Sequence, residues 1–262
     1  MKFRGRELMY QVRDGLLGLL NAFIPDYIVG RILYRYYLFK DRLAPILGGI
    51  WSFLPLRCRS PRSVEYKWVI DTLRRINCNK RLLDVGCSGS YLCYELLHLG
   101  FNVHGLDAEP YQCKKTSFMF HLCDIVKTPF PDNYFDVIVA VSVLEHIGLG
   151  AYGDPRHPDG DRLAIKELRR ILSGGGYLLI TVPYAYGYSV TWRRVYGWET
   201  LISVTDDFHL IEASFFVPTS RFYASKTDLF IGGGRWLRAS KLKAEEDKAG
   251  ISIACLLLRK KA

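Results

Sequence analysis

The stretch Pro129–Gly148, PFPDNYFDVIVAVSVLEHIG, opens as a proline-rich turn and continues as an apolar run that ends at Glu145 and His146. An apolar run without polar alternation is typical of a strand with both faces buried, and such strands lie inside parallel sheets covered by helices. We therefore predict that Val137–Val143 is a central strand. The two titratable side chains would then follow its carboxyl end.

The segments on either side alternate between short apolar stretches and helical patterns. The predicted strands are RLLDVG, FNVHGLD, FHLCD and GYLLITVP. The predicted helices are VEYKWVIDTLRRI, YLCYELLHLG, which Gly100 would close, the segment Pro110–Met119, and DRLAIKELRRIL. HLIEASFFV and ISIACLLLR follow without a helix between them, which predicts an antiparallel pair at one edge. This alternation favours an α/β, doubly wound, mostly parallel sheet over residues 62–262.

The first 61 residues differ in composition from the rest of the chain. Of the 262 residues 49% are hydrophobic, so a packed core is expected, but the net charge of +10 is concentrated near the start. The segment is also rich in Leu, Ile and aromatic residues. We predict a helical extension, 1–61, that contacts a membrane surface, acts as a lid or simply covers the core. No signal peptide or membrane span is expected.

The seven cysteines are odd in number and have no CxxC spacing. This pattern predicts reduced thiols in a cytoplasmic protein, and neither a disulfide framework nor a zinc knuckle.

Acidic side chains end successive predicted strands, where ligands bind in parallel sheets. Asp84 precedes a glycine-containing turn, and Asp107 follows 23 positions later, where a carboxylate could accept both hydroxyls of a ribose. Asp124 could accept a hydrogen bond from an adenine amino group. The fourth strand ends in Glu145 and His146. Together these positions predict a nucleoside-shaped ligand across the sheet.

Three motifs resemble one family, the class I S-adenosylmethionine-dependent methyltransferases of type 11. LLDVGCSGS is similar to the family's LDVGCGTG loop, and PFPDNYFDVIVAVSVLEHI is similar to its PFPDNSFDVV…VLEHI segment. KELRRILSGGGYLLITVP resembles the family's helix, glycine turn and fifth strand. The resemblance covers roughly residues 64–262. It implies a Rossmann-like sheet of seven strands and S-adenosyl-L-methionine as the cofactor.

By position, the resemblance places Gly86 and its loop at the methionine part of the cofactor, Asp107 at the ribose and Asp124 at the adenine. Asp84 would support the loop and the cofactor's amino group. Ser88 and Ser90 stand where the family usually has glycine, which leaves the geometry of the loop open. The expected cofactor-binding residues are Asp84, Gly86, Cys87, Ser88, Gly89, Asp107, Ala108, Cys123, Asp124, Ile125 and Val141.

The segment EHIGLGAYGDPRHPDGD is the candidate catalytic loop, because it gathers titratable side chains among glycines and prolines. His146 is the first candidate for a base; alternatively, it only braces the loop with Glu145. Asp161 is interpreted as a helix N-cap. A divalent ion on Glu145, His146, His157 and nearby aspartates is a weaker alternative, and no metal is expected. The candidate catalytic residues are His146, Glu145, Asp154 and His157.

The segment Pro183–Trp198 is the candidate acceptor site, because aromatic rings stack on sugars and arginines bind phosphates or carboxylates. The loop GLGxYGDPxxPDGD resembles methyltransferases of glycan synthesis, which favours a small or lipid-linked acceptor with a sugar hydroxyl. An RNA methyltransferase and a non-catalytic scaffold remain alternatives. The candidate acceptor-binding residues are Tyr184, Tyr186, Tyr188, Trp192, Arg193 and Arg194.

Overall fold

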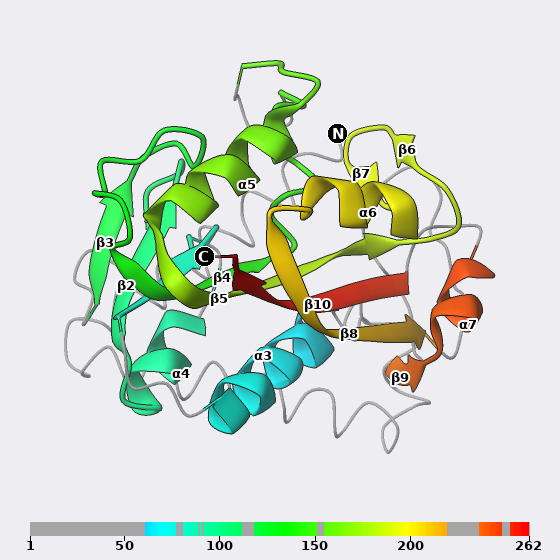
Figure 1. The fold of residues 1–262 in the computed structure, drawn as a ribbon, viewed down its shortest axis with the longest axis horizontal. Helices are drawn as coiled ribbons and strands as arrows, with labels where there is room; N and C mark the ends of the chain where they lie inside the picture. Colours follow the sequence, from blue (N-terminus) through cyan, green and yellow to red (C-terminus); the bar gives the residue numbers. More distant parts are fainter. Residues whose placement is uncertain are drawn as a thin grey trace, which may run out of the picture.

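A computed structural model describes residues 61–76, 81–88, 90, 92–111, 118–150, 155–218, 236–247 and 252–261. Within these residues the chain forms one large sheet with helices on both faces (Figure 1). The predicted extension before residue 61, and the candidate site residues Gly89 and Asp154, lie outside the described residues.

The sheet has eight described strands in the order β3-β2-β1-β4-β5-β10-β8-β9. The first five are mutually parallel, whereas β10 is antiparallel to β5 and β8, and β9 is antiparallel to β8. The mostly parallel sheet and its antiparallel edge are thus confirmed, with one strand more than predicted. The strands are β1 Arg81–Val85, β2 Asn102–Asp107, β3 Met119–Leu122, β4 Phe135–Val141, β5 Leu172–Tyr184, β8 Phe208–Pro218, β9 Trp236–Ala239 and β10 Ser252–Lys260.

Strand β4 lies between β1 and β5, as the unbroken apolar run predicts. It ends at Val141, two residues earlier than predicted, because Ser142 adopts a positive φ of 49° and turns the chain. The strand order reverses between β1, which continues to β2 and β3, and β4, which continues to β5. A crevice therefore opens beyond the carboxyl ends of β1 and β4, where ligands of such sheets bind.

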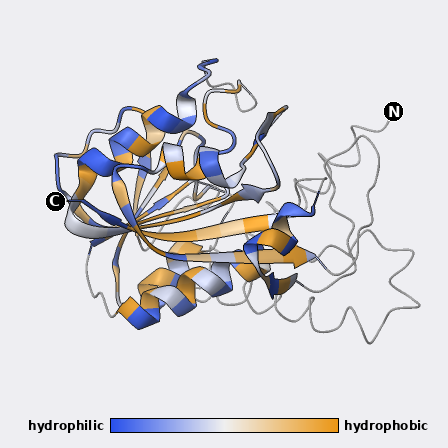
Figure 2. Ribbon diagram, turned by 45° about the vertical axis from the view of Figure 1, so that its right-hand side comes forward, coloured by the Kyte–Doolittle hydropathy of each residue, from blue (hydrophilic) through white to orange (hydrophobic). Residues whose placement is uncertain are grey.

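Helices cover both faces of the sheet with their apolar sides turned inward (Figure 2). Two helices, α3 Arg62–Ile76 and α4 Leu92–His98, pack on one face. The other face carries α5 Gly160–Ile171 and α6 Trp198–Val204. The short α7, Lys241–Glu245, lies next to β8. None of the helices that the structure describes is long and apolar enough to cross a membrane.

The helix predictions are largely confirmed. Gly100 has a φ of 90° and follows α4, where its freedom from a Cβ allows the left-handed turn that closes the helix. In the predicted helix Pro110–Met119, residues 112–117 are outside the described part, and Met119 belongs to β3. At that end the prediction is wrong, because the strand pairs with β2 from Met119 onward.

Candidate active site

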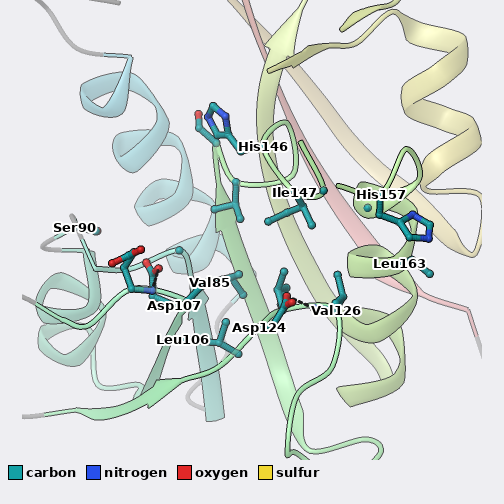
Figure 3. Close-up of a pocket in the computed structure, with 18 of the residues that line it drawn as sticks. Val85, Ser90, Leu106, Asp107, Asp124, Val126, His146, Ile147, His157 and Leu163 are labelled. Atoms are coloured by element: carbon teal, nitrogen blue, oxygen red, sulfur yellow. Dashed lines mark hydrogen bonds between the residues drawn. The ribbon is translucent and has the colours of Figure 1, made fainter. Parts of the chain in front are cut away.

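A cavity of about 600 Å³ opens at the carboxyl ends of β1, β2 and β4 (Figure 3). Its walls come from the loops after β1, β2, β3 and β4, from the first turn of α3 and from the start of α5. The structure thus brings together side chains that lie far apart in the sequence. The predicted site residues that line it are Gly86, Asp107, Ala108, Asp124, Ile125, His146 and His157.

The loop after β1 is held open by backbone conformation and by one carboxylate. Gly86 has a φ of 72°, and a Cβ there would lie 2.5 Å from Cγ2 of Val143, so the backbone itself forms the cavity wall. The Asp107 carboxylate accepts hydrogen bonds from the backbone N–H of Ser88 at 2.7 Å and of Glu109 at 2.9 Å. These bonds orient both oxygens of Asp107 at the cavity edge, where they could also accept ligand hydroxyls.

Asp84 lies behind this loop instead of lining the cavity. It is 2% exposed, and the Cys93 thiol donates to its carboxyl at 3.2 Å. Burial raises the pKa of Asp84 to about 7. Among the other predicted cofactor residues, Cys87 and Val141 are buried, and Ser88 and Cys123 are also absent from the cavity lining. These residues can support the cavity walls, but their side chains do not face a ligand in the cavity.

Asp124 and a set of apolar side chains form a further part of the cavity wall. The Asp124 carboxylate accepts from the backbone N–H of Val126 at 3.0 Å, which fixes its direction at the start of the turn after β3. Such a wall suits a flat, partly polar ring system, because the apolar side chains pack against the ring and the Asp124 carboxylate accepts a hydrogen bond from its polar group. The apolar lining on this side comprises Leu106, Ile125, Val126, Ile147 and Leu163.

Glu145 and His146 are adjacent in sequence, but only one of the two side chains faces the cavity. Glu145 is 2% exposed and does not line the cavity, and burial raises its pKa to about 8. His146 does line the cavity, with its Nε2 3.8 Å from Oε1 of Glu145. The His146 ring stacks on Trp192, with centroids 5.3 Å apart and planes at 26°. Of the adjacent pair, only His146 is placed to meet a ligand.

The sequence reasoning missed the contribution of α3. Arg62 and Tyr66 line the cavity, and Arg62 donates to the carbonyl oxygen of Val141. Glu65, which is fully buried, accepts from the hydroxyls of Ser142 at 2.5 Å and Thr181 at 2.6 Å. The one available signal was that Arg62 and Tyr66 are four residues apart and share a helix face. Arg62 brings a cation into a cavity otherwise rich in carboxylates.

The predicted acceptor residues divide into two groups. Tyr186, Tyr188 and Trp192 are exposed on the segment that contains the hairpin of β6, Ser189–Val190, and β7, Arg194–Val195. The Arg193 guanidinium lies over the Trp192 ring, 5.1 Å from its centroid. This group forms an aromatic surface that reaches the cavity through the stack of Trp192 on His146.

For Tyr184 and Arg194 the prediction of acceptor contact is wrong, because both are fully buried. The Tyr184 hydroxyl donates to Glu245 at 2.8 Å, and the Arg194 guanidinium is turned toward backbone carbonyls. The N-cap interpretation of Asp161 is also wrong. Asp159 occupies the N-cap position of α5, and the buried Asp161 accepts from the Tyr196 hydroxyl at 2.9 Å.

Among the described residues, no group of three or more His, Cys, Asp or Glu side chains is arranged to hold a metal ion.

The parallel sheet, its reversal between β1 and β4, and the acidic strand ends around one cavity define the class I S-adenosylmethionine-dependent methyltransferase fold. Residues 83–180 match the methyltransferase domain family. Over these residues the chain is similar to methyltransferase domains, as the sequence motifs predict.

Two solved structures have the same fold. The 1,6-didemethyltoxoflavin-N1-methyltransferase of Burkholderia thailandensis, crystallised with S-adenosylhomocysteine, is 14% identical with a TM-score of 0.52, over 87% of this chain and 89% of that one. The [4+2]-cyclase SpnF has a TM-score of 0.52 and 19% identity, over 75% of this chain and 81% of its own. At these identities the likeness concerns the fold.

Two curated relatives match parts of the chain. A ubiquinone biosynthesis O-methyltransferase of Bradyrhizobium diazoefficiens is 30% identical over 118 residues, which is 41% of this chain and 45% of the relative. A ubiquinone/menaquinone biosynthesis C-methyltransferase of Paraburkholderia xenovorans is 41% identical over 59 residues, 22% of this chain and 20% of the relative. The chain thus spans less than half the length of these curated relatives.

Proposed function

We propose that this protein is an S-adenosylmethionine-dependent methyltransferase whose acceptor is a small or lipid-linked molecule with a sugar hydroxyl. The observation that carries the proposal is the convergence of Gly86, Asp107, Asp124 and His146 on one cavity. The match of residues 83–180 to the methyltransferase domain family supports the same activity.

The cavity residues fit the cofactor part by part. The Gly86 backbone, free of a Cβ, admits the methionine chain closely, and Arg62 can pair with its carboxylate. The oriented Asp107 carboxylate suits the ribose hydroxyls, and Asp124 suits the adenine amino group. When bound, S-adenosylmethionine supplies an electrophilic methyl group on a cationic sulfonium. The roles of Asp107, Asp124 and Arg62 are then binding and orientation, which leaves in-line placement of the acceptor to the remaining walls.

His146 is the group proposed to take the acceptor's proton. Its ring lines the cavity and stacks on Trp192, so it lies between the cofactor loops and the aromatic surface. An oxygen acceptor benefits from a base at this position, since a neutral imidazole can remove a hydroxyl proton as the new bond forms. Glu145 lies 3.8 Å behind His146 and, with its raised pKa, supports the loop chiefly as a neutral carboxyl.

Stacking favours a ring-bearing acceptor. Trp192 presents an exposed aromatic face beside the cavity-lining His146, and Tyr186 and Tyr188 are exposed on the same segment. Such faces pack well against sugar or aromatic rings. A phenolic hydroxyl is the second candidate acceptor. The same aromatic surface supports it, as does similarity to an O-methyltransferase of ubiquinone biosynthesis.

The proposed setting is the cytoplasm, with peripheral membrane contact through residues 1–60. The composition of this segment, basic and apolar together, supports the contact. Deletion of residues 1–60 should abolish flotation with anionic liposomes and leave cofactor binding unchanged. Equal flotation of both proteins would refute the membrane contact.

The decisive experiment is in two stages. Calorimetry should first show saturable binding of S-adenosylmethionine and S-adenosylhomocysteine, and absence of binding would refute the methyltransferase proposal. Methyl-labelled cofactor is then incubated with glycan, lipid and RNA fractions of the host, with the His146→Gln variant as control. Label in a glycan or glycolipid that depends on His146 supports the sugar acceptor, whereas label in an aromatic lipid or in RNA refutes it in favour of that class. No label in any fraction favours a non-catalytic role.

A further inference from the structure

Arg194 is fully buried and joins two loops of the site. Its Nη1 donates to the carbonyl oxygens of Ile147 at 2.6 Å and Leu144 at 3.4 Å, and its Nη2 donates to Pro158 at 2.8 Å. Its backbone N–H donates to the carbonyl oxygen of Glu145 at 2.8 Å. One residue of β7 therefore binds the loop after β4 and the turn before α5 at the same time.

The charge of this arginine is balanced by Asp161, which is also buried. The Asp161 carboxylate lies 3.5 Å from Nε of Arg194 and accepts from the Tyr196 hydroxyl at 2.9 Å. A buried ion pair of this kind contributes mainly by fixing one arrangement, because desolvation offsets much of its attraction. We call Arg194, Asp161 and Tyr196 the Arg194 clamp.

The two loops that the clamp joins have little room to move relative to each other. His157 donates its backbone N–H to the carbonyl oxygen of Gly148 at 2.8 Å. A Cβ on Gly148 would lie 2.3 Å from the carbonyl oxygen of His157, and a Cβ on Gly160 would lie 2.5 Å from that of Ile147. The loops therefore touch backbone to backbone. Each loop carries one cavity-lining histidine, His146 or His157, and the two rings lie apart from each other in Figure 3.

The clamp also sets the position of the aromatic surface. Trp192 precedes Arg194 by two residues in the hairpin and stacks on His146. Arg194 thus anchors the strand that delivers the Trp192 ring to the imidazole, and it binds the carbonyls on both sides of His146. A shift of the hairpin would move Trp192 and His146 apart.

We propose that Arg194 is a positioning residue for the acceptor side of the site, which holds His146 against Trp192 and ties the loop of His146 to the turn that carries His157. Its value for methyl transfer rests on the proposed function, whereas the positioning itself can be tested without substrate. The guanidinium is a planar fork whose several donors point in fixed directions, and a lysine ammonium cannot reach the same carbonyls together. Arg194→Lys therefore keeps the positive charge but loses the simultaneous hydrogen bonds to the carbonyl oxygens of the two loops.

The test compares Arg194→Lys with two controls in the full chain. Arg238→Met removes an exposed arginine of β9 that pairs with Glu212, and Leu257→Ala weakens the core at a buried residue of β10. NMR reports the imidazole proton resonances of His146, which the Trp192 ring current displaces, and Trp192→Ser defines the unstacked position. Hydrogen exchange reports the backbone amides of His146 and Ile147, and calorimetry reports binding of S-adenosylhomocysteine.

In Arg194→Lys, the His146 resonances should move toward those of Trp192→Ser, and the two amides should exchange about tenfold faster. Binding of S-adenosylhomocysteine should stay within about threefold of the wild type, because the clamp touches neither Asp107 nor the Gly86 loop. Arg238→Met and Leu257→Ala should leave the His146 resonances in place. Wild-type resonances and exchange in Arg194→Lys, or an equal displacement in Leu257→Ala, would overturn the proposal.

If Arg194→Lys does not fold, Tyr196→Phe provides the second variant, since it removes only the hydroxyl that donates to Asp161. A smaller displacement in the same direction supports the clamp, and no displacement refutes it. A wild-type protein that fails to bind S-adenosylhomocysteine would refute the proposed function, while the His146 readout would still decide the role of Arg194.

Discussion

Replacement of Glu145 by glutamine should remove a large part of the protein's loss of stability at alkaline pH. Burial raises the pKa of Glu145 from 4.5 to about 8 in the folded state. Between these values the folded protein binds a proton that the unfolded chain has released. The free energy of unfolding therefore falls as pH rises through this window, by about 1.4 kcal/mol per pH unit.

Most of this pH dependence of the free energy of unfolding falls between pH 6 and pH 9, where the protein can be studied. From pH 6 to pH 9 the unfolded carboxyl is ionised throughout, while the folded one titrates near pH 8. Integration gives a loss of about 2.5 kcal/mol from Glu145 alone. Asp84, whose pKa is raised to about 7, adds a similar trend at lower pH, but it is present in both proteins and cancels in the comparison.

The measurement is urea unfolding of wild type and Glu145→Gln at pH 6 and pH 9, without cofactor. The variant should lose about 2.5 kcal/mol less than the wild type over this range. Glu246→Gln, which changes an exposed carboxyl at the C-cap of α7, is the matched control and should follow the wild type. Equal pH dependence of Glu145→Gln and wild type would show that Glu145 is ionised in the folded protein and refute the reasoning.

Three further substitutions test the cavity. Asp107→Asn should weaken S-adenosylhomocysteine binding about 10-fold to 100-fold in calorimetry, because it disturbs the charge-assisted hydrogen bonds of this carboxylate. The control Asp136→Asn, at the amino end of β4, should bind normally. Gly86→Ala should lower both affinity and melting temperature, and the added substitution Val143→Ala should recover only the steric part, since the φ of 72° remains. Glu65→Ala should cost about 3–5 kcal/mol in thermal unfolding, because the buried Thr181 hydroxyl, the partly buried Ser142 hydroxyl and the Arg62 cation lose a fully buried partner. A loss under about 1 kcal/mol would contradict this burial effect.

The sequence by itself determined the sheet and the half of the site that lies at strand ends. Apolar runs such as Val137–Val141 have no solvent face in any register, so they specify buried parallel strands from local pattern alone. In such a sheet the carboxyl ends meet at one edge. Asp107, Asp124 and His146 were therefore predictable as residues of one site, because each lies at or shortly after the carboxyl end of a recognisable strand.

Only the tertiary structure decided which side chains beyond the strand ends reach the cavity. Arg62 comes from a helix whose own pattern shows only which face is apolar, and the packing of this helix against the end of β4 brings Arg62 to the cavity. Arg194 lies in the same aromatic and basic segment as the exposed Trp192, and nothing in the local sequence separates the two. In the structure Arg194 is nevertheless buried against Asp161. Burial of a charge depends on partners supplied by distant segments, and local sequence does not encode where those partners arrive.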